Sequence, residues 1–218
     1  MSRFDLSSDI EFAENPEPRC PCVILLDTSQ SMEGERIAAL ERGLVKLKEA
    51  LVEDLLASLR VEVALVTFAS RVKTVHRFTT PDRLELPELR AAGKTHMGSA
   101  ILHALDLLEA RKKEYRDNDI DYYRPWIFLL TDGVPQGEDD SIIEEATEEI
   151  RTLEERKSLC FFAIGFGEAD MRRLAKISVR PPVALQNLKF EELFLWVSRS
   201  MRIAASGNYS QEPLPPPG

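Results

Sequence analysis

The sequence predicts an α/β protein with a doubly wound, mostly parallel sheet of six strands, one antiparallel edge strand, and helices on both faces. Three observations support this fold class. Apolar stretches rich in β-branched residues alternate with amphipathic helical patterns along the 218 residues. These apolar stretches are short and uninterrupted, as in strands buried on both faces. Two of them are separated only by Ala69 and Ser70, which predicts a hairpin and therefore one antiparallel strand.

Polar side chains follow the first predicted strand at the point where it ends. An apolar run from Cys22 to Leu26 leads directly into Asp27, Ser29 and Ser31. Ligands of open α/β sheets bind at the carboxyl ends of the strands. One carboxylate and two hydroxyls offer hard oxygen donors, which suit Mg²⁺ or another small divalent cation better than zinc. Taken singly, each of these residues is more often a helix cap or a turn residue than a metal ligand.

The remaining elements follow in order. Leucines recurring every three or four residues from Gly34 to Leu59 predict one long amphipathic helix. We then expect strands at 61–68 and 71–78, a loop at 81–92, a helix after Gly98 that fades into the charged segment 112–121, a strand at 126–130, an acidic helix at 141–157, a strand at 159–164, a short helix at 170–177, a short strand at 183–185 and a final helix at 190–204. This organisation predicts a polar arm at 1–19, one domain at 20–206 and a disordered proline-rich tail at 207–218.

Two later turns carry further oxygen donors. Thr95 lies in a Gly-Lys-Thr-His-Met-Gly loop before a helix, and Asp132 lies in a Thr-Asp-Gly turn after the strand that ends at Leu130. We expect that strand to neighbour the first one where the strand order reverses, so that their loops meet. Five oxygen donors would then line one crevice, and this joint occurrence favours a metal site over five unrelated caps and turns.

Composition excludes several classes of function. The formal net charge is −9 and no cluster of Lys and Arg forms a basic stripe, so nucleic acid and anionic membranes are poor partners. The three cysteines give no disulfide framework, and no apolar run approaches the ~20 residues of a membrane helix. The chain opens with no signal peptide, so we expect a cytoplasmic protein.

Enzymatic interpretations find little support in the sequence. Gly93-Lys94-Thr95 imitates the end of a phosphate-binding loop, but Glu88 stands where that motif requires glycine. Of the three histidines only His96 is near the predicted crevice, where it fits a rim residue better than a ligand. An aspartyl-phosphate mechanism would need a second carboxylate at Ser29. We therefore predict no catalytic residue, with a metal-dependent phosphoester hydrolase and a scaffold with an inert metal site as the alternatives.

The sequence resembles the von Willebrand factor A-type domains. Asp27-x-Ser29-x-Ser31, Thr95 in its Gly-x-Thr-x-x-Gly segment, and Thr131-Asp132-Gly133 are similar to the three parts of that family's metal-ion-dependent adhesion site (MIDAS). The similarity extends over about residues 21–204. The short format, Arg-Pro-Trp before the fourth strand and Ile-Gly-Phe-Gly after the fifth most resemble the TerY-like bacterial proteins of tellurium-resistance and stress operons.

The resemblance implies roles for these residues. Ser29, Ser31 and, in the ligand-competent state, Thr95 would bind Mg²⁺ directly, while Asp27 and Asp132 would hold coordinated waters. The ion is expected to be Mg²⁺, with Mn²⁺ or Ca²⁺ as alternatives, and to accept an Asp or Glu carboxylate from a protein partner. TerY-like proteins are associated with a protein kinase and a metal-dependent protein phosphatase, so the resemblance implies stress phosphosignalling.

Overall fold

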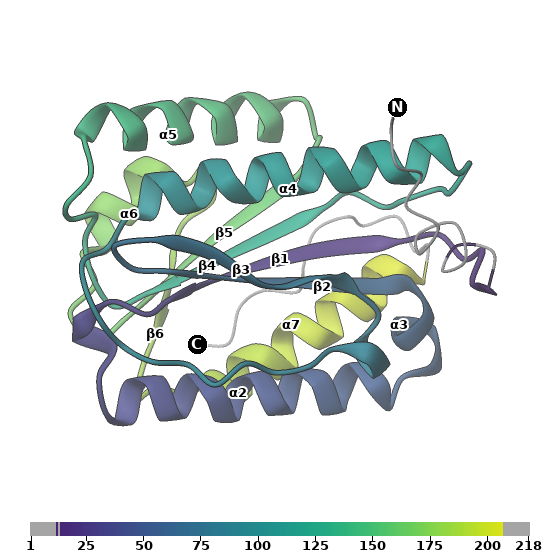
Figure 1. Ribbon diagram of the computed structural model, residues 1–218, viewed down its shortest axis with the longest axis horizontal. Coiled ribbons are helices and arrows are strands. Elements are labelled where there is room, and N and C mark those ends of the chain that lie inside the picture. Colours follow the sequence, from purple (N-terminus) through teal and green to yellow (C-terminus); the bar gives the residue numbers. More distant parts are fainter. Residues whose placement is uncertain (1–11, 13, 207–218) are drawn as a thin grey trace.

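A six-stranded sheet with the order β3-β2-β1-β4-β5-β6 runs through the middle of the molecule (Figure 1). The computed structural model describes residue 12 and residues 14–206. All neighbouring strands are parallel except β2 and β3, so the predicted fold class is confirmed. The strands are β1 (Cys20–Asp27), β2 (Val61–Phe68), β3 (Val72–Thr79), β4 (Trp126–Thr131), β5 (Cys160–Phe166) and β6 (Val183–Leu185).

Helices cover both faces of this sheet. Helices α2, α3 and α7 lie on one face, and α4, α5 and α6 lie on the other (Figure 1). Their bounds are α2 (Glu35–Val52), α3 (Leu55–Arg60), α4 (Met97–Asp117), α5 (Asp140–Glu155), α6 (Met171–Ile177) and α7 (Phe190–Ala205), with short 3-10 turns η1 (Gln30–Met32) and η2 (Pro81–Arg83). No helix among the described residues has the length and apolar character needed to cross a bilayer.

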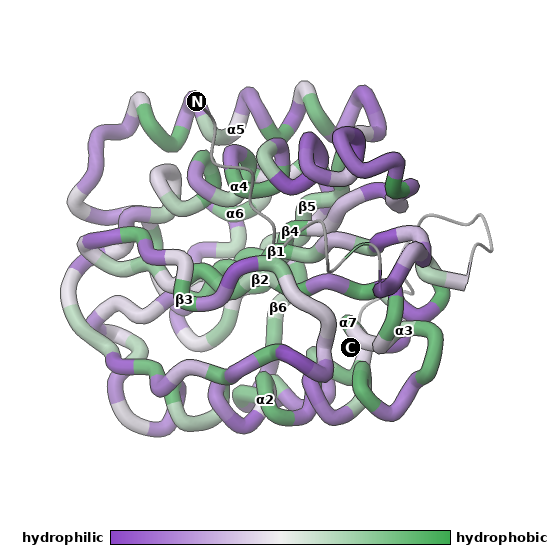
Figure 2. The backbone as a smooth tube through the Cα atoms, turned by 45° about the vertical axis from the view of Figure 1, so that its right-hand side comes forward, coloured by the Kyte–Doolittle hydropathy of each residue, from purple (hydrophilic) through white to green (hydrophobic). Residues whose placement is uncertain are grey.

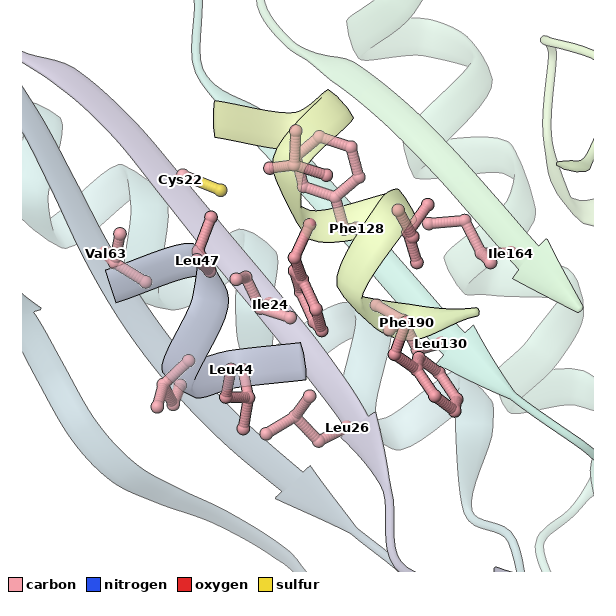
Figure 3. Close-up of a cluster of buried hydrophobic side chains, with 14 of the residues drawn as sticks. Cys22, Ile24, Leu26, Leu44, Leu47, Val63, Phe128, Leu130, Ile164 and Phe190 are labelled. Carbon is pink, nitrogen blue, oxygen red and sulfur yellow. The ribbon is translucent and has the colours of Figure 1, made fainter. Parts of the chain in front are cut away.

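The central strands are buried on both faces because alternate side chains enter two separate cores. Ile24 of β1 packs under α2 and α7 together with Phe128 and Phe190, and Figure 3 shows this core from close by. Val23 and Leu25 of the same strand pack under α4 and α5. Hydropathy colouring shows β1, β4 and β5 as a hydrophobic centre between helices of mixed character (Figure 2). The carboxyl ends of β1 and β4 are therefore held rigidly side by side.

The predicted long helix from Gly34 to Leu59 is wrong, because the chain forms two helices there. Helix α2 ends at Val52, and the side chain of Asp54 then accepts hydrogen bonds from the backbone N–H groups of the next helix at 3.1 and 2.8 Å. That cap starts α3 in a new direction. Leu55, which continued the apolar repeat, is 84% exposed and packs in neither core.

Smaller differences concern element ends. The β2–β3 hairpin has three linking residues instead of two, closed by a hydrogen bond from the Ala69 N–H to the Arg71 carbonyl. Strand β5 continues through Gly165 to Phe166. Helix α4 does not end near residue 112 but continues to Asp117, because Lys112 and Tyr115 are buried against the rest of the protein.

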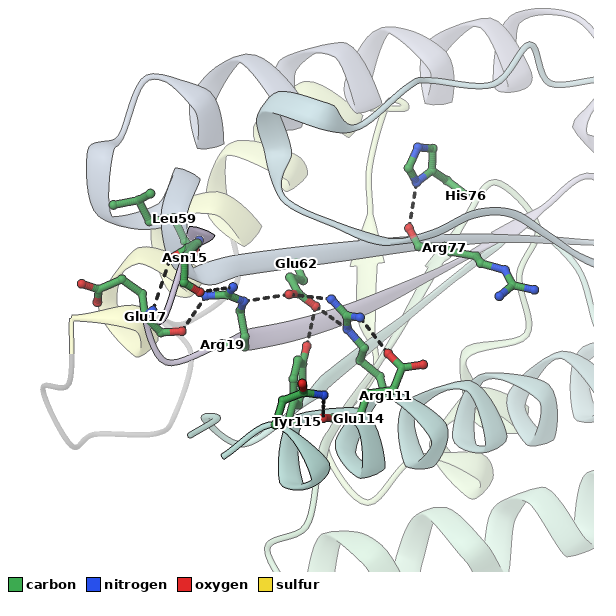
Figure 4. A network of polar contacts seen from close by, with 11 residues as sticks. Asn15, Glu17, Arg19, Leu59, Glu62, His76, Arg77, Arg111, Glu114 and Tyr115 are labelled. Atoms are coloured by element: carbon green, nitrogen blue, oxygen red, sulfur yellow. Dashed lines mark hydrogen bonds and ion pairs between the residues drawn. The ribbon is translucent and has the colours of Figure 1, made fainter. Parts of the chain in front are cut away.

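A buried ionic cluster fixes the amino-terminal end of the sheet (Figure 4). Glu62 of β2 is fully buried and accepts hydrogen bonds from Arg19, Arg111 and Tyr115, at distances of 2.5–2.8 Å. The aromatic ring of Phe12 lies beneath both guanidinium groups. This part of the predicted polar arm therefore packs on the domain, while the proline-rich tail at 207–218 and most of the arm lie outside the described residues.

Candidate metal centre

Asp27, at the end of β1, is buried and has a hydrogen-bond donor on each carboxylate oxygen. Its Oδ1 accepts from the backbone N–H of Ser29 at 2.8 Å, and its Oδ2 accepts from the hydroxyl of Thr131 at 2.6 Å. Burial raises the pKa of Asp27 to about 6, and the hydrogen bonds from Ser29 and Thr131 oppose that rise only in part. Asp27 therefore ties the end of β1 to the end of β4.

Ser29, Ser31 and Asp132 form a continuous polar chain beside it. The hydroxyl oxygens of Ser29 and Ser31 are 3.0 Å apart, and the Ser31 hydroxyl donates to Oδ1 of Asp132 at 2.6 Å. The Asp132 side chain is fully buried, and its Oδ2 accepts from the Arg36 guanidinium at 2.6 Å. Residues 101 positions apart in sequence thus share one hydrogen-bonded group at the edge of the sheet.

Thr95 joins this group from a third loop. Its backbone N–H donates to the Gln136 carbonyl at 3.1 Å, and the Gln136 N–H donates back to the Thr95 carbonyl at 2.9 Å. A Cβ placed on Gly133 would lie 3.8 Å from the Thr95 hydroxyl oxygen, so that hydroxyl is adjacent to the turn that carries Asp132. Among the described residues, the Thr95 hydroxyl has no hydrogen-bond partner.

Backbone hydrogen bonds hold the three loops together. The N–H of Ala92 donates to the Thr28 carbonyl at 2.8 Å, and the N–H of Gln30 donates to the Gly93 carbonyl at 3.0 Å. These bonds join the Thr95 loop to the loop after β1, while the Gln136 pair joins it to the loop after β4. All five oxygen donors expected from the sequence, Asp27, Ser29, Ser31, Thr95 and Asp132, therefore meet at one edge.

The alternative role as helix caps does not account for Ser31 and Thr95. Helix α2 begins after Gly34 with no side-chain cap. The N-terminus of α4 is capped from a distance by Glu138, whose carboxylate accepts from the backbone N–H groups of Gly98 and Ser99 at 2.6 and 3.0 Å. Neither hydroxyl therefore caps a helix.

The three histidines lie as the sequence suggested, apart from one another and with only His96 near the candidate metal centre. His96 is half-buried next to Thr95, His76 lies on β3, and the ring of His103 contacts the Thr74 hydroxyl at 2.7 Å. All three cysteines are free and buried, and burial raises the pKa of each thiol. In the described part of the chain, no three or more His, Cys, Asp or Glu side chains are arranged so that they could hold a metal ion by themselves. A metal at this edge would therefore depend on hydroxyl ligands.

The donor set fits a hard divalent cation. It consists of three hydroxyls and two carboxylates, all oxygen, and of these five residues only Ser31 is exposed. Sequence reasoning missed Arg36 and Gln136, which contact the donors, and Glu138, which caps α4. It quoted Thr131 as part of the Thr131-Asp132-Gly133 segment without its hydrogen bond to Asp27. Thr131 is adjacent to Asp132, but the contacts of the others depend on tertiary folding and carry no local sequence signal.

Comparison with known families gives an independent result. The model of the von Willebrand factor type A domain matches residues 22–194, which is most of the chain. No curated protein sequence matches significantly.

Solved structures with a similar fold come from diverse organisms. Proximal thread matrix protein 1 (PTMP1) of the mussel byssus superposes with a TM-score of 0.61 at 16% identity, covering 86% of this chain and 49% of that one. VWA2, the ArnB paralog of Sulfolobus acidocaldarius, gives 0.57 at 16%, with 84% and 45% covered. The vWF domain of the type V pili tip protein Mfa5 of Porphyromonas gingivalis gives 0.68 at 11%, with 86% and 96% covered.

These similarities establish the fold alone, because sequence identity is low. The chain spans about half the length of the first two structures. A further crystal structure of the mussel protein, with a TM-score of 0.54 at 16% identity, is described as having a zinc-occupied MIDAS motif; 88% of this chain and 46% of that one are covered.

Proposed function

The chain is a member of the von Willebrand factor type A domain family, and on that premise we propose that it is a metal-dependent protein interaction module and not an enzyme. Ser29, Ser31 and Thr95 are the proposed direct ligands of a divalent ion, with Asp27 and Asp132 behind them. The ion is Mg²⁺ in this proposal, with Mn²⁺ or Ca²⁺ as alternatives. When bound, the ion would offer an electrophilic position to an Asp or Glu carboxylate of a protein partner.

The observation that carries this proposal is the convergence of hydroxyls beside two buried carboxylates. The Ser29 and Ser31 hydroxyls are 3.0 Å apart, and Ser31 contacts Asp132 at 2.6 Å. Neutral hydroxyl ligands leave a divalent ion with most of its positive charge, so it can attract a carboxylate strongly. The protein's net charge of −9 gives no general attraction for an acidic partner, so recognition would be local to the ion.

The surroundings of Asp27 favour binding over hydrolysis. Its two oxygens accept hydrogen bonds from Ser29 and Thr131, which gives the side chain a structural role in joining β1 to β4. Ser29 occupies the position where an aspartyl-phosphate mechanism would need its second carboxylate.

Thr95→Ala tests the interaction directly. The substitution removes the hydroxyl but leaves both backbone hydrogen bonds to Gln136, so the fold should be retained. Loss of a charge-assisted contact in an interface costs roughly 2 to 5 kcal/mol, which weakens partner binding by more than tenfold. Thr147→Ala is the matched control, because that hydroxyl bonds the Ile143 carbonyl on α5, away from the three loops.

The assay is capture of partner proteins from the source cell by the parent and the two variants, with Mg²⁺ and with chelator. The proposal expects a partner that is lost with Thr95→Ala and with chelator and kept with Thr147→Ala. A partner that ignores both changes would support the inert scaffold instead. Turnover of a generic phosphoester with Mg²⁺, abolished by Ser29→Ala and unaffected by Ser141→Ala, would support the hydrolase.

We further propose a setting in bacterial tellurium-resistance or stress phosphosignalling, in the cytoplasm, with a protein kinase and a metal-dependent protein phosphatase as partners. The support is the resemblance of two segments, Arg124-Pro125-Trp126 and Ile164-Gly165-Phe166-Gly167, to TerY-like proteins. The proposed domain covers residues 20–206. Identification of the captured proteins by mass spectrometry tests this setting, and the absence of any kinase or phosphatase among Mg²⁺-dependent partners would reject it.

A further inference from the structure

Arg36 places a positive charge within the candidate metal centre. It lies in the first turn of α2, and its Nη1 donates both to Oδ2 of Asp132 at 2.6 Å and to the Ser31 carbonyl at 2.9 Å. Its side chain is 32% exposed, whereas that of Asp132 is fully buried. One guanidinium group thus binds two of the residues proposed to hold the divalent ion.

The surrounding backbone leaves room for this guanidinium. Gly34 has a φ of +83° directly before α2, which lets the chain turn from η1 into the helix that carries Arg36. On the other side, a Cβ placed on Gly167 would lie 3.4 Å from Cζ and Nη2 of Arg36. The guanidinium therefore lies over the carboxyl ends of β4 and β5, between Asp132 and Gly167.

We propose that Arg36 competes with the divalent ion for Asp132 and so weakens binding of the metal alone. This inference rests on the proposed function. Asp132 is buried and needs a positive partner, and the protein supplies one from its own α2 helix. An ion held near the same carboxylate would meet a like charge, and its coordinated water would share an acceptor that Arg36 already occupies. Arg36 is therefore a positioning residue that lowers the affinity of the site for the divalent ion.

The size of the effect follows from the contact that must weaken. A hydrogen bond to a charged group contributes enough to change an equilibrium constant by about tenfold to a hundredfold. Removing the guanidinium should therefore tighten binding of the metal by about that factor. A purely structural role, in which Arg36 only neutralises Asp132 during folding, predicts lower stability with no change in metal affinity.

Direct titration of the full chain with Mn²⁺ tests the proposal. After chelator treatment and dialysis, free Mn²⁺ is measured by electron paramagnetic resonance for the parent, Arg36→Gln, Arg36→Met, Arg36→Lys and Arg42→Gln. Arg42→Gln removes the same charge from the same helix, where Arg42 pairs with the exposed Glu35 and with no other acidic side chain among the described residues. We expect Arg36→Gln and Arg36→Met to bind Mn²⁺ about tenfold to a hundredfold more tightly, and Arg36→Lys and Arg42→Gln to stay within about threefold of the parent.

A measurement on the parent protein avoids dependence on variant folding. The ¹⁵Nε signal of Arg36 should shift on addition of diamagnetic Mg²⁺, because the pair with Asp132 loosens, while the Arg42 signal should stay in place. Equal Mn²⁺ affinities for Arg36→Gln and the parent, or an unchanged Arg36 signal at saturating Mg²⁺, would overturn the competition. If no protein, the parent included, binds Mn²⁺, then the proposed function fails together with this inference.

Discussion

Asp27→Asn should stabilise the metal-free protein while abolishing its response to metal. Burial raises the pKa of Asp27 from 3.8 to about 6, so the folded state disfavours the ionised carboxylate. A pKa difference of about two units corresponds to about 3 kcal/mol once the group is fully ionised. Asn accepts the Ser29 N–H as Asp does but obliges the Thr131 hydroxyl to turn, so we expect a net gain of about 1 to 3 kcal/mol at pH 8.

The stability difference between Asp27→Asn and the parent should depend on pH. The folded state binds the Asp27 proton more tightly than the unfolded chain, so the contribution of Asp27 to stability falls as pH rises from about 4 through about 6. The difference in unfolding free energy between Asp27→Asn and the parent should therefore be small near pH 4 and reach its full value above pH 7.

Urea denaturation in chelator at several pH values measures this difference. Asp139→Asn is the opposite control. Hydrogen bonds from Ser141 lower the pKa of Asp139, so the ionised carboxylate stabilises the folded state, and Asp139→Asn should become less stable than the parent as pH rises. In millimolar Mg²⁺ the parent should melt at a higher temperature and Asp27→Asn should not. An Asp27→Asn protein no more stable than the parent at pH 8 in chelator, or a difference that is constant across pH, would refute the reasoning.

Two further predictions concern buried contacts away from the metal centre. Glu62→Gln leaves the buried guanidiniums of Arg19 and Arg111 without their carboxylate, and should lower the free energy of unfolding by about 3 to 5 kcal/mol in urea denaturation. The control is Glu109→Gln: the Glu109 carboxylate is exposed, so this substitution should change the free energy of unfolding by less than about 1 kcal/mol. Equal effects of the two substitutions would contradict the argument. Gly98→Ala should lower it by about 1 to 3 kcal/mol, because the added Cβ would lie 2.9 Å from the backbone nitrogen of Ile143; an unchanged denaturation midpoint would show that α4 and α5 separate easily.

The sheet was predictable because its determinants are local and repeated. Apolar runs such as the one from Cys22 to Leu26 specify buried parallel strands, and the short link after Phe68 specifies the antiparallel edge. The break between α2 and α3 was missed because Leu55 continues the apolar repeat, and only the hydrogen bonds of Asp54 reveal that a new helix begins. Hydrophobic periodicity alone does not reveal a helix boundary when the apolar repeat continues on both sides of the capping residue.

Charged residues show where sequence reasoning stops. Lys112 and Tyr115 belong to the charged segment 112–121 into which the helix was expected to fade. The structure instead buries both, and the Tyr115 hydroxyl bonds Glu62, about fifty residues away in the sequence. The five oxygen donors were found from their spacing, and the structure brings them to one edge; their role as ligands stays a prediction. Arg36 was missed because a charge five residues after Ser31 has no meaning until α2 turns it toward Asp132.

The reciprocal backbone pair between Thr95 and Gln136 makes the two loops one mechanical unit. Any shift of Thr95 that keeps both hydrogen bonds must carry Gln136 with it, and Glu138, two residues further on, is bound to the start of α4. A partner that pulls on Thr95 would thus apply its load to the segment that leads into α5. Residues 133–139 link this edge of the sheet to α5, so we expect their stiffness to decide how much of a displacement of Thr95 reaches the outer helices.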